Sequence, residues 1–354
     1  MQLNFLKKFK RIPVKEKIFF VQHLEVMLKA GISLAEALKT LSLQTENKRF
    51  KEIIVDITQG VEKGEPLSNH LAKYNRVFDN LFVNMIKAGE ASGQLENVLR
   101  RIYIQMKKDH ELRSKVKGAM IYPAVVVFAM IVIGTLMIVF VIPKITAVFK
   151  EAEVTLPLPT RVLMATSEFV IQNYLVVIIA LIGLIYFFFK LISTKRGKYI
   201  FHSILLRLPI IASIIKKINL ARFSRTFSSL LKTDIPIMQT LDITANILGN
   251  VLYKEEVLKA SRSVTKGISL GELLKKNGSL FPPVVTQMIL VGEQTGSLDN
   301  VLEELAEFYE NDIDQIMKNL PSIIEPVLIL ILGVAVAGMA IAVIMPMYSL
   351  TQAI

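Results

Sequence analysis

Gly89–Leu99 reads GEASGQLENVL, and Gly292–Leu302 reads GEQTGSLDNVL. The second stretch follows the first by 203 positions, and at that same shift residues 20–126 align with residues 223–329 without a gap. Two unrelated amphipathic helical regions would not keep one register over such a length. The chain therefore contains one unit twice. We call residues 20–126 copy one and residues 223–329 copy two, and we expect the copies to share a fold.

Each copy is predicted to be a bundle of about six helices, because its apolar residues recur at helical spacing and no strand-like alternation is present. In copy one, Gly31 ends the first helix, and Ser33 and Glu36 form a capping box that starts the second. Gly64 ends the third helix, and Pro66 opens a short fourth. The expected helices lie at residues 16–29, from 33 onward, at 47–62, after 66, at 79–88 and from 95 toward the membrane.

Three apolar stretches are long enough to cross a bilayer of about 30 Å. They lie at residues 119–141, at 174–189 with an extension to 192, and at 323–345. The chain has 354 residues, 52% of them hydrophobic, and a mean hydropathy of +0.48, which is high for a soluble protein. Because Pro123 in the first stretch aligns with Pro326 in the third, each copy runs into a membrane span.

Lysine and arginine crowd the ends of the spans that adjoin the two copies, and the net charge is +12. This distribution predicts that the N-terminus and both copies are cytoplasmic and that the C-terminus lies outside. The predicted segments are a basic N-terminal segment at 1–15, the first bundle at 16–118, transmembrane helix 1 at 119–143, an outer loop at 144–170, transmembrane helix 2 at 171–192, the second bundle at 193–322, transmembrane helix 3 at 323–346 and an outer tail at 347–354.

The residue inventory excludes several classes of function. The chain has no cysteine, and its four histidines lie far apart, so neither a disulfide framework nor a local metal site is expected. No phosphate-binding glycine loop or catalytic motif occurs, so we expect no enzyme, no metal and no cofactor. Nucleic-acid binding is not expected, because the basic residues gather where membrane topology requires them. An oligomeric channel or permease subunit stays an alternative, although the spans supply few polar residues.

The Gly-Glu-x-x-Gly elements have two interpretations. Glycines four apart suit a tight link between helices, with Ser92 and Thr295 as candidate N-caps of the helix that follows. Alternatively, Glu90 and Glu293 contact a partner or the sister copy. The glycines and prolines expected to act as structural connectors are Gly64, Gly267, Gly89, Gly93, Gly292, Gly296, Pro123 and Pro326.

The spans contain a few residues of special interest. Glu325 lies beside Pro326 at a membrane boundary, where an ionisable group is a candidate interface residue unless it is simply solvated by the headgroup zone. The prolines at positions 123, 143, 326 and 346 are expected to kink or end their helices.

Several stretches together resemble one known family, the inner-membrane platform proteins of type IV pilus and type II secretion machines, also called the type II secretion F family. In and after copy one they are MLKAGISLAEAL (27–38), KGEPLSNHL (63–71), MIKAGEASGQLENVLRR (85–101), KVKGAMIYPAVV (115–126) and LPLPT (156–160). In and before copy two they are LLKTDIPIMQTL (230–241), FPPVVTQMILVGEQTGSLDNVLEELAEFYE (281–310) and IIEPVLILILG (323–333).

The resemblance implies an all-α membrane protein with three transmembrane helices and two cytoplasmic six-helix domains. It implies a non-enzymatic scaffold in the bacterial inner membrane on which a cytoplasmic assembly ATPase acts, so that pilin or pseudopilin subunits are lifted from the membrane into a fibre. Other inner-membrane assembly proteins, membrane lipid and further copies of the chain are the other implied partners. Pilus, secretion and DNA-uptake versions all stay open.

Overall fold

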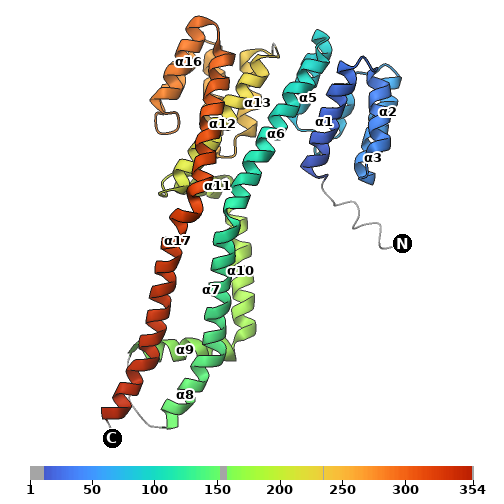
Figure 1. Ribbon diagram of the computed structural model, residues 1–354. Coiled ribbons are helices and arrows are strands. Elements are labelled where there is room, and N and C mark those ends of the chain that lie inside the picture. Colours follow the sequence, from blue (N-terminus) through green and yellow to red (C-terminus); the bar gives the residue numbers. More distant parts are fainter. Residues whose placement is uncertain (1–11, 152–157, 234, 353–354) are drawn as a thin grey trace. The chain divides into compact units, whose positions relative to one another are not determined.

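The computed structural model of the chain describes residues 12–151, 158–233 and 235–352, and every regular element in that part is a helix (Figure 1). Copy one contains the six helices that the periodicity predicts. They are α1 (Val14–Lys29), α2 (Leu34–Gln44), α3 (Lys48–Glu62), α4 (Leu67–Lys73), α5 (Asn80–Ser92) and α6 (Leu95–Ala119). The Ser33 hydroxyl accepts the backbone N–H of Glu36 at 3.3 Å, which is the N-cap contact expected of a capping box.

Copy two repeats this order after an additional helix, α11 (Lys195–Leu205). Its helices are α12 (Ile211–Leu231), α13 (Ile237–Ile247), α14 (Val251–Val264), α15 (Leu270–Lys275), α16 (Pro283–Thr295) and α17 (Leu298–Gln352). Matched helices make matched contacts, since α2 packs on α3 as α13 packs on α14, and α4 packs on α5 as α15 packs on α16. The prediction that both copies share a fold is confirmed.

The same aromatic cluster fills the core of each copy. In copy one, the ring centroid of Phe20 lies 5.5 Å from that of Phe50 and 6.1 Å from that of Phe78. The residues at the matched positions of copy two are Phe223, Tyr253 and Phe281, and they are buried as well. The hydroxyl of Tyr253 donates to the carbonyl of Leu280 at 2.7 Å, so its buried polar atom is satisfied.

Both copies belong to one compact unit, formed by residues 12–114 and 202–313. Their cores are partly shared, because Leu230, Ile235 and Ile243 of copy two join the apolar cluster that contains Phe20 of copy one. A second unit is formed by the described residues of 115–201 and 314–352. The sequence predicted two bundles, and the structure packs these two bundles against each other.

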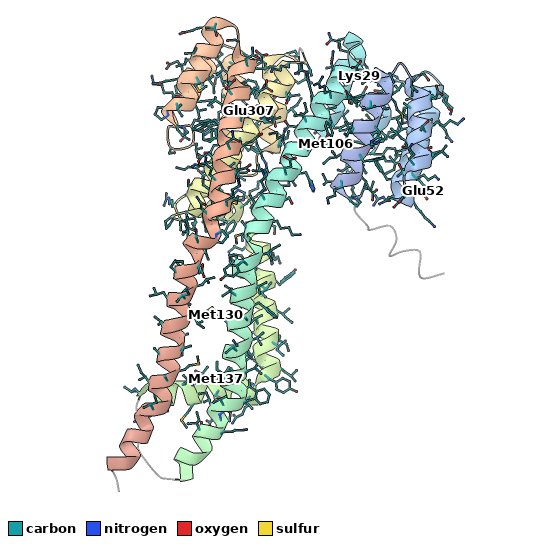
Figure 2. All side chains as sticks on the ribbon, viewed as in Figure 1. Lys29, Glu52, Met106, Met130, Met137 and Glu307 are labelled. Carbon is teal, nitrogen blue, oxygen red and sulfur yellow. The ribbon has the colours of Figure 1, made fainter. Side chains whose placement is uncertain are left out.

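The second unit contains the apolar helices. It comprises α7 (Ile121–Leu136), the π-helix η2 (Met137–Val141), α8 (Ile142–Glu151), α9 (Leu158–Gln172), α10 (Tyr174–Ser193) and the later part of α17. Three segments of the described chain are long and apolar enough to cross a membrane, at 95–146, 174–193 and 298–341, and their apolar windows are almost entirely exposed in the protein. Met130 and Met137 are two of the apolar side chains on these helices (Figure 2). The three predicted spans are confirmed.

The segment predicted to be an outer loop, residues 144–170, is helical over most of its described length. It contains the end of α8 and most of α9, and α9 packs on η2, α8 and α10. The hydroxyl of Ser167 in α9 donates to the carbonyl of Ile138 in η2 at 2.5 Å. That carbonyl lies five residues before Pro143, which has no N–H to donate in a π-helical turn. The connection between the first two spans is therefore largely helical, and its place outside the membrane stays a prediction.

The matched prolines behave differently in the two copies. Before Pro123, α6 ends at Ala119 and α7 begins at Ile121, so the helix is interrupted as expected. Pro326 lies inside α17, which continues as one helix to Gln352, so of the two expected effects Pro326 does not end the helix.

Candidate functional site

The glutamate of the first Gly-Glu-x-x-Gly element caps a helix within its own copy. The Glu90 carboxylate accepts the backbone N–H of Leu67 at 2.5 Å and that of Ser68 at 3.1 Å. These residues open α4, whose own N-cap residue, Pro66, has no side-chain acceptor. A negative charge at this position also suits the dipole of the helix. The end of α5 is thereby fixed to the start of α4.

Copy two repeats the arrangement. The Glu293 carboxylate accepts the backbone N–H groups of Leu270 at 2.7 Å and Gly271 at 3.1 Å, and the hydroxyl of Ser269 at 2.5 Å. Both glutamates thus have partners in their own copy. Their geometry favours the structural connector over a contact between the sister copies.

The glycines of each element serve two different purposes. Gly93 and Gly296 cap α5 and α16 in the left-handed region, with φ of 68° and 70°. Gly89 and Gly292 lie inside these helices, although a position in the turn between helices was expected for them. A Cβ at Gly89 would come within 2.9 Å of a side chain of α6, and one at Gly292 would come within 2.9 Å of the α17 backbone. The first glycine of each pair therefore permits close packing between helices.

The residues expected at the starts and ends of helices have two different outcomes. Ser92 and Thr295 are not N-caps, because they are the last residues of α5 and α16 and their hydroxyls donate to carbonyls four residues earlier, at 2.9 and 2.8 Å. The hydroxyl of a residue inside a helix often bonds backward in this way. Gly64 and Gly267 follow α3 and α14 with φ of 81° and 76°, as a glycine at a helix end requires.

A polar seam joins copy one to copy two, and we define it by Gln105, Asp109, Arg222, Thr226 and Ser229. The amide of Gln105 in α6 donates to the Thr226 hydroxyl at 3.1 Å and accepts from the Ser229 hydroxyl at 3.4 Å. One helical turn along α6, the guanidinium of Arg222 donates to the Asp109 carboxylate at 3.0 Å. The Gln105 side chain is buried, so these bonds satisfy polar atoms that water does not reach.

A buried arginine continues this network into α17. Arg225 donates two parallel hydrogen bonds to Glu310, at 2.9 and 3.0 Å, and its side chain is only 7% exposed. Lys108 of copy one lies 3.1 Å from the same carboxylate. Glu310 therefore bridges the buried arginine of copy two and a lysine of copy one, and bidentate pairs of this kind have a fixed geometry.

Sequence reasoning missed this network, although one signal was available. At the register of the repeat, Arg225 and Glu310 correspond to Gln22 and Lys107 of copy one. A position that gains a charge in one copy, together with a second position that reverses charge, points to an interaction that only one copy makes. Neither change is visible unless the copies are aligned residue by residue.

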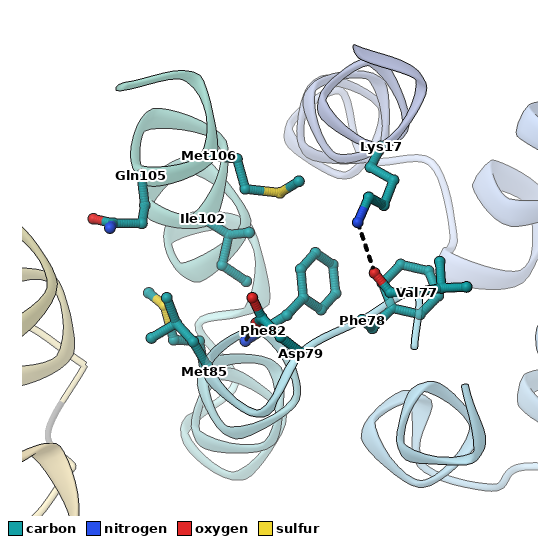
Figure 3. A pocket seen from close by; sticks show the side chains of 10 residues that line it. Lys17, Val77, Phe78, Asp79, Phe82, Met85, Ile102, Gln105 and Met106 are labelled. Atoms are coloured by element: carbon teal, nitrogen blue, oxygen red, sulfur yellow. Dashed lines mark hydrogen bonds between the residues drawn. The ribbon is translucent and has the colours of Figure 1, made fainter. Parts of the chain in front are cut away.

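A small pocket lies in copy one beside Lys17 (Figure 3). Its volume is about 50 Å³ and its lining is largely apolar, including Phe78, Phe82 and Met106. Burial lowers the pKa of Lys17, whose ammonium donates to the Val77 carbonyl at 2.9 Å. Ligand sites usually have volumes of about 300–1,000 Å³, so this pocket does not fit an organic substrate.

The remaining candidates lack the surroundings of a chemical site. Glu325 is exposed on α17, and it makes no hydrogen bond or ion pair with the part of the chain that the structure describes. Within residues 12–151, 158–233 and 235–352, no three acidic or histidine side chains are grouped closely enough to hold a metal ion.

Comparison with known proteins agrees with this architecture. The family model described as type II secretion system (T2SS), protein F matches the chain twice, at residues 20–143 and 223–346. The chain belongs to this family. The two matches start 203 residues apart and also end 203 residues apart, which is the shift found from the sequence alone. The internal repeat of the chain is therefore the repeat of the type II secretion F family.

Curated relatives from both branches of the family are similar over nearly the whole chain. The type IV pilus assembly protein PilC of Thermus thermophilus is 33% identical over 95% of this chain and 83% of its own length. The PilC of Pseudomonas aeruginosa is 31% identical over 98% of this chain and 93% of its own. The type II secretion system protein F of Vibrio cholerae is 31% identical over 97% and 85%.

Proposed function

We propose that this chain is the inner-membrane platform of a type IV pilus or type II secretion machine. The proposal rests on one observation: the chain contains two six-helix copies, and each copy is followed by a membrane span. The chain is also similar to pilus and secretion proteins over almost all of its length. The platform is not an enzyme. It receives the motion of a cytoplasmic assembly ATPase and uses it to extract pilin or pseudopilin subunits and add them to a fibre, beside other inner-membrane assembly proteins.

We infer that helices α6 and α17 pass this motion along the chain. Each begins at the connector of its copy and leads toward a span, and α17 is one helix from Leu298 to Gln352. In this arrangement the N-terminus and both copies are cytoplasmic, and the C-terminus is outside. The ATPase then acts on the copies, and the spans meet the subunits in the lipid.

The alternative of an oligomeric channel or permease gains no support from the second unit. Its pocket of about 360 Å³ is lined by Gly134, Met137, Ile138, Ile142, Val162, Leu163, Thr166, Ala335 and Met339. Ion and solute paths need polar or ionisable groups, and this lining has only one hydroxyl. Solute flux through liposomes that hold only this protein would restore the alternative.

The proposal is tested by breaking the helix between copy one and its span. Inserting Gly-Gly-Ser-Gly between Lys117 and Gly118 should abolish surface fibres or secretion in a cell whose only platform gene carries the insertion, because a flexible link transmits little motion. Four alanines at the same place are the matched control and should preserve more activity. Both variants should still be found in the membrane. Wild-type fibre numbers with the flexible insertion would refute the coupling role, and unaltered assembly after deletion of the gene would refute the platform role.

A further inference from the structure

The two copies meet through two different faces. Copy one contributes α5 and α6, and copy two contributes α12 and α13, while Glu310 of α17 reaches Lys108 from the side of α17 opposite to Phe308. Gln105 of α6 contacts Thr226 of α12, and the Gln239 amide of α13 donates to Asn84 of α5 at 3.0 Å. We call the α5–α6 side of a copy face A and the α1–α2 side, or its counterpart in copy two, face B. At the register of the repeat, α12 and α13 of copy two are equivalent to α1 and α2, so the contact joins face A of copy one to face B of copy two.

Such a contact leaves one face of each copy unused. Face B of copy one is formed by α1 and α2, and face A of copy two is formed by α16 and α17. An interface of unlike faces is heterologous, and it can repeat from one molecule to the next.

Burial at matched positions agrees with this assignment for face B. Arg222 and Ser229 of copy two are half-buried, whereas their equivalents in α1 of copy one, Phe19 and Val26, are 45% and 53% exposed. The part of α12 from Asn219 to Leu230 is buried on nearly all sides, whereas α1 buries only the side that faces its own core. Phe19, His23 and Val26 lie on one side of α1, because they are spaced by four and three residues.

Face A shows the same contrast. Leu81 in α5 of copy one is 9% exposed, and its equivalent, Val284 of α16, is 48% exposed. Gln105 of α6 is 7% exposed, and its equivalent, Phe308 of α17, is 57% exposed. Phe308 follows the exposed Glu307 in the sequence, and Figure 2 labels Glu307 on α17. The position that forms the seam in copy one is therefore a large exposed aromatic residue in copy two.

The unused faces also match each other chemically. The seam positions Gln105, Thr226, Ser229 and Arg222 become Phe308, His23, Val26 and Phe19, and Asp109 becomes Asp312, which already pairs with Lys217 at 2.7 Å. The His23 ring already stacks on Phe19 with centroids 3.7 Å apart, so face B offers an aromatic and aliphatic patch to a phenylalanine. An isolated exposed apolar residue needs no explanation, but two patches at reciprocal positions of one interface do.

We propose that a second copy of this chain docks face B of its copy one, through Phe19, His23 and Val26, onto face A of copy two, through Val284 and Phe308. The contact between chains repeats the contact within the chain, with an apolar centre in place of the polar seam. Because two spans separate the copies, both copies lie on the same side of the membrane, which allows chains to associate head to tail. This inference concerns the association of the chain with itself and does not depend on the machine in which it works.

Because the chain has no cysteine, every disulfide in the full-length protein must join cysteines that have been introduced. Phe308→Cys and Val26→Cys variants, carrying different tags and produced together in one membrane, should form a mixed disulfide dimer on mild oxidation. This pair is equivalent to Gln105 and Ser229, whose amide oxygen and hydroxyl oxygen are 3.4 Å apart. A chain with both Gln105→Cys and Ser229→Cys is the positive control, and it should close a disulfide within one chain and remain a monomer. Phe308→Cys together with Val55→Cys, an exposed position in α3, should give no mixed dimer.

Three results would decide against the proposal. Predominant Phe308→Cys homodimers or Val26→Cys homodimers would mean that like faces meet. A mixed dimer that forms equally well with Val55→Cys would mean random collision. Monomers alone, in a preparation in which the positive control closes, would mean that the faces do not dock. A Phe308→Gln variant, which carries the residue of copy one at that position, should shift the full-length protein in detergent toward smaller assemblies.

Discussion

The Glu90 carboxylate accepts the backbone N–H of Leu67 at 2.5 Å, and this bond spans 23 residues of the chain. Glu293 makes the equivalent bond to Leu270 at 2.7 Å in copy two. A side chain from one helix thus acts as the N-terminal cap of another. The repeated Gly-Glu-x-x-Gly element therefore forms a tertiary contact that joins two helices, in addition to the turn.

Replacing the capping glutamate should destabilise the copy that contains it. Glu90→Ala leaves the first N–H groups of α4 without this acceptor, which should lower the free energy of unfolding by about 1–2 kcal/mol. Glu90→Gln keeps an oxygen acceptor but removes the charge, so its effect should be smaller. Denaturant unfolding of the full-length protein in detergent measures both. Glu62→Gln, at an exposed position, is the control and should change little.

The doubly substituted Glu90→Gln, Glu293→Gln protein separates the two interpretations of these residues. If they are structural, the number of fibres per cell should follow the amount of folded protein in the membrane. Loss of fibres with normal amounts of folded, membrane-inserted protein would instead indicate a contact with a partner.

The two glycines of the element should respond differently to the same substitutions. Gly93 has φ of 68°, so Gly93→Ala should cost about 1–2 kcal/mol and Gly93→Asn less, because asparagine tolerates the left-handed region. Gly89 has helical geometry but no room, so Gly89→Ala should cost about 1–3 kcal/mol and Gly89→Asn more. Thermal unfolding of the four variants measures this order. The same ranking of Ala and Asn at both positions would contradict the distinction.

Local patterns predicted the helices well, because their causes are local. The limits of α1 to α6 follow from apolar periodicity, from Ser33 and from glycines such as Gly64. The role of Gly93 at the end of α5 is local and was expected of a glycine at that link, whereas the role of Gly89 was not predictable because it depends on the packing of α6 against α5. The polar seam was not predictable from the sequence either, because nothing around Gln105 indicates that α12 packs against it.

Arg225 should be among the most sensitive residues of the first unit. Arg225→Met leaves the partly buried Glu310 without its bidentate partner, and breaking such a pair costs about 3–5 kcal/mol. Arg225→Lys keeps the charge but loses the bidentate geometry of the guanidinium, so its stability should lie between that of Arg225→Met and that of the wild type. The control is Lys275→Met, which removes the exposed pair with Glu272 and should change stability by less than about 0.5 kcal/mol.

A double-mutant cycle with Glu310→Met shows whether the interaction itself is responsible. The loss of stability in the double variant should be smaller than the sum of the two single losses, because each single variant leaves one member of the bidentate pair without the other while Lys108 stays beside Glu310 in Arg225→Met. Additive effects of the two substitutions in denaturant unfolding would be inconsistent with the pairing.

Acid should weaken the contact between Lys232 and Glu303. The hydrogen bond from Lys232 lowers the pKa of Glu303 from its usual 4.5, against the opposing effect of partial burial. The folded state therefore binds fewer protons than the unfolded state, so this contribution to stability is present above about pH 4.5 and is lost as the pH falls through the lower pKa of the folded state. Lys232→Met should flatten this dependence. Parallel pH profiles of unfolding for wild type and variant would show that the pair is not responsible.

The topology of the chain can be tested directly with reporters at equivalent positions of the repeat. Three spans place copy one and copy two on the same side, because the chain crosses and returns between them. Fusions after Lys63 and after Lys266 should therefore both report the cytoplasm, and a fusion at the C-terminus should report the outside, as the basic residues beside the spans predict. Opposite signals from Lys63 and Lys266 would mean that one apolar helix does not cross, and the two copies could then not share their core as the structure has them.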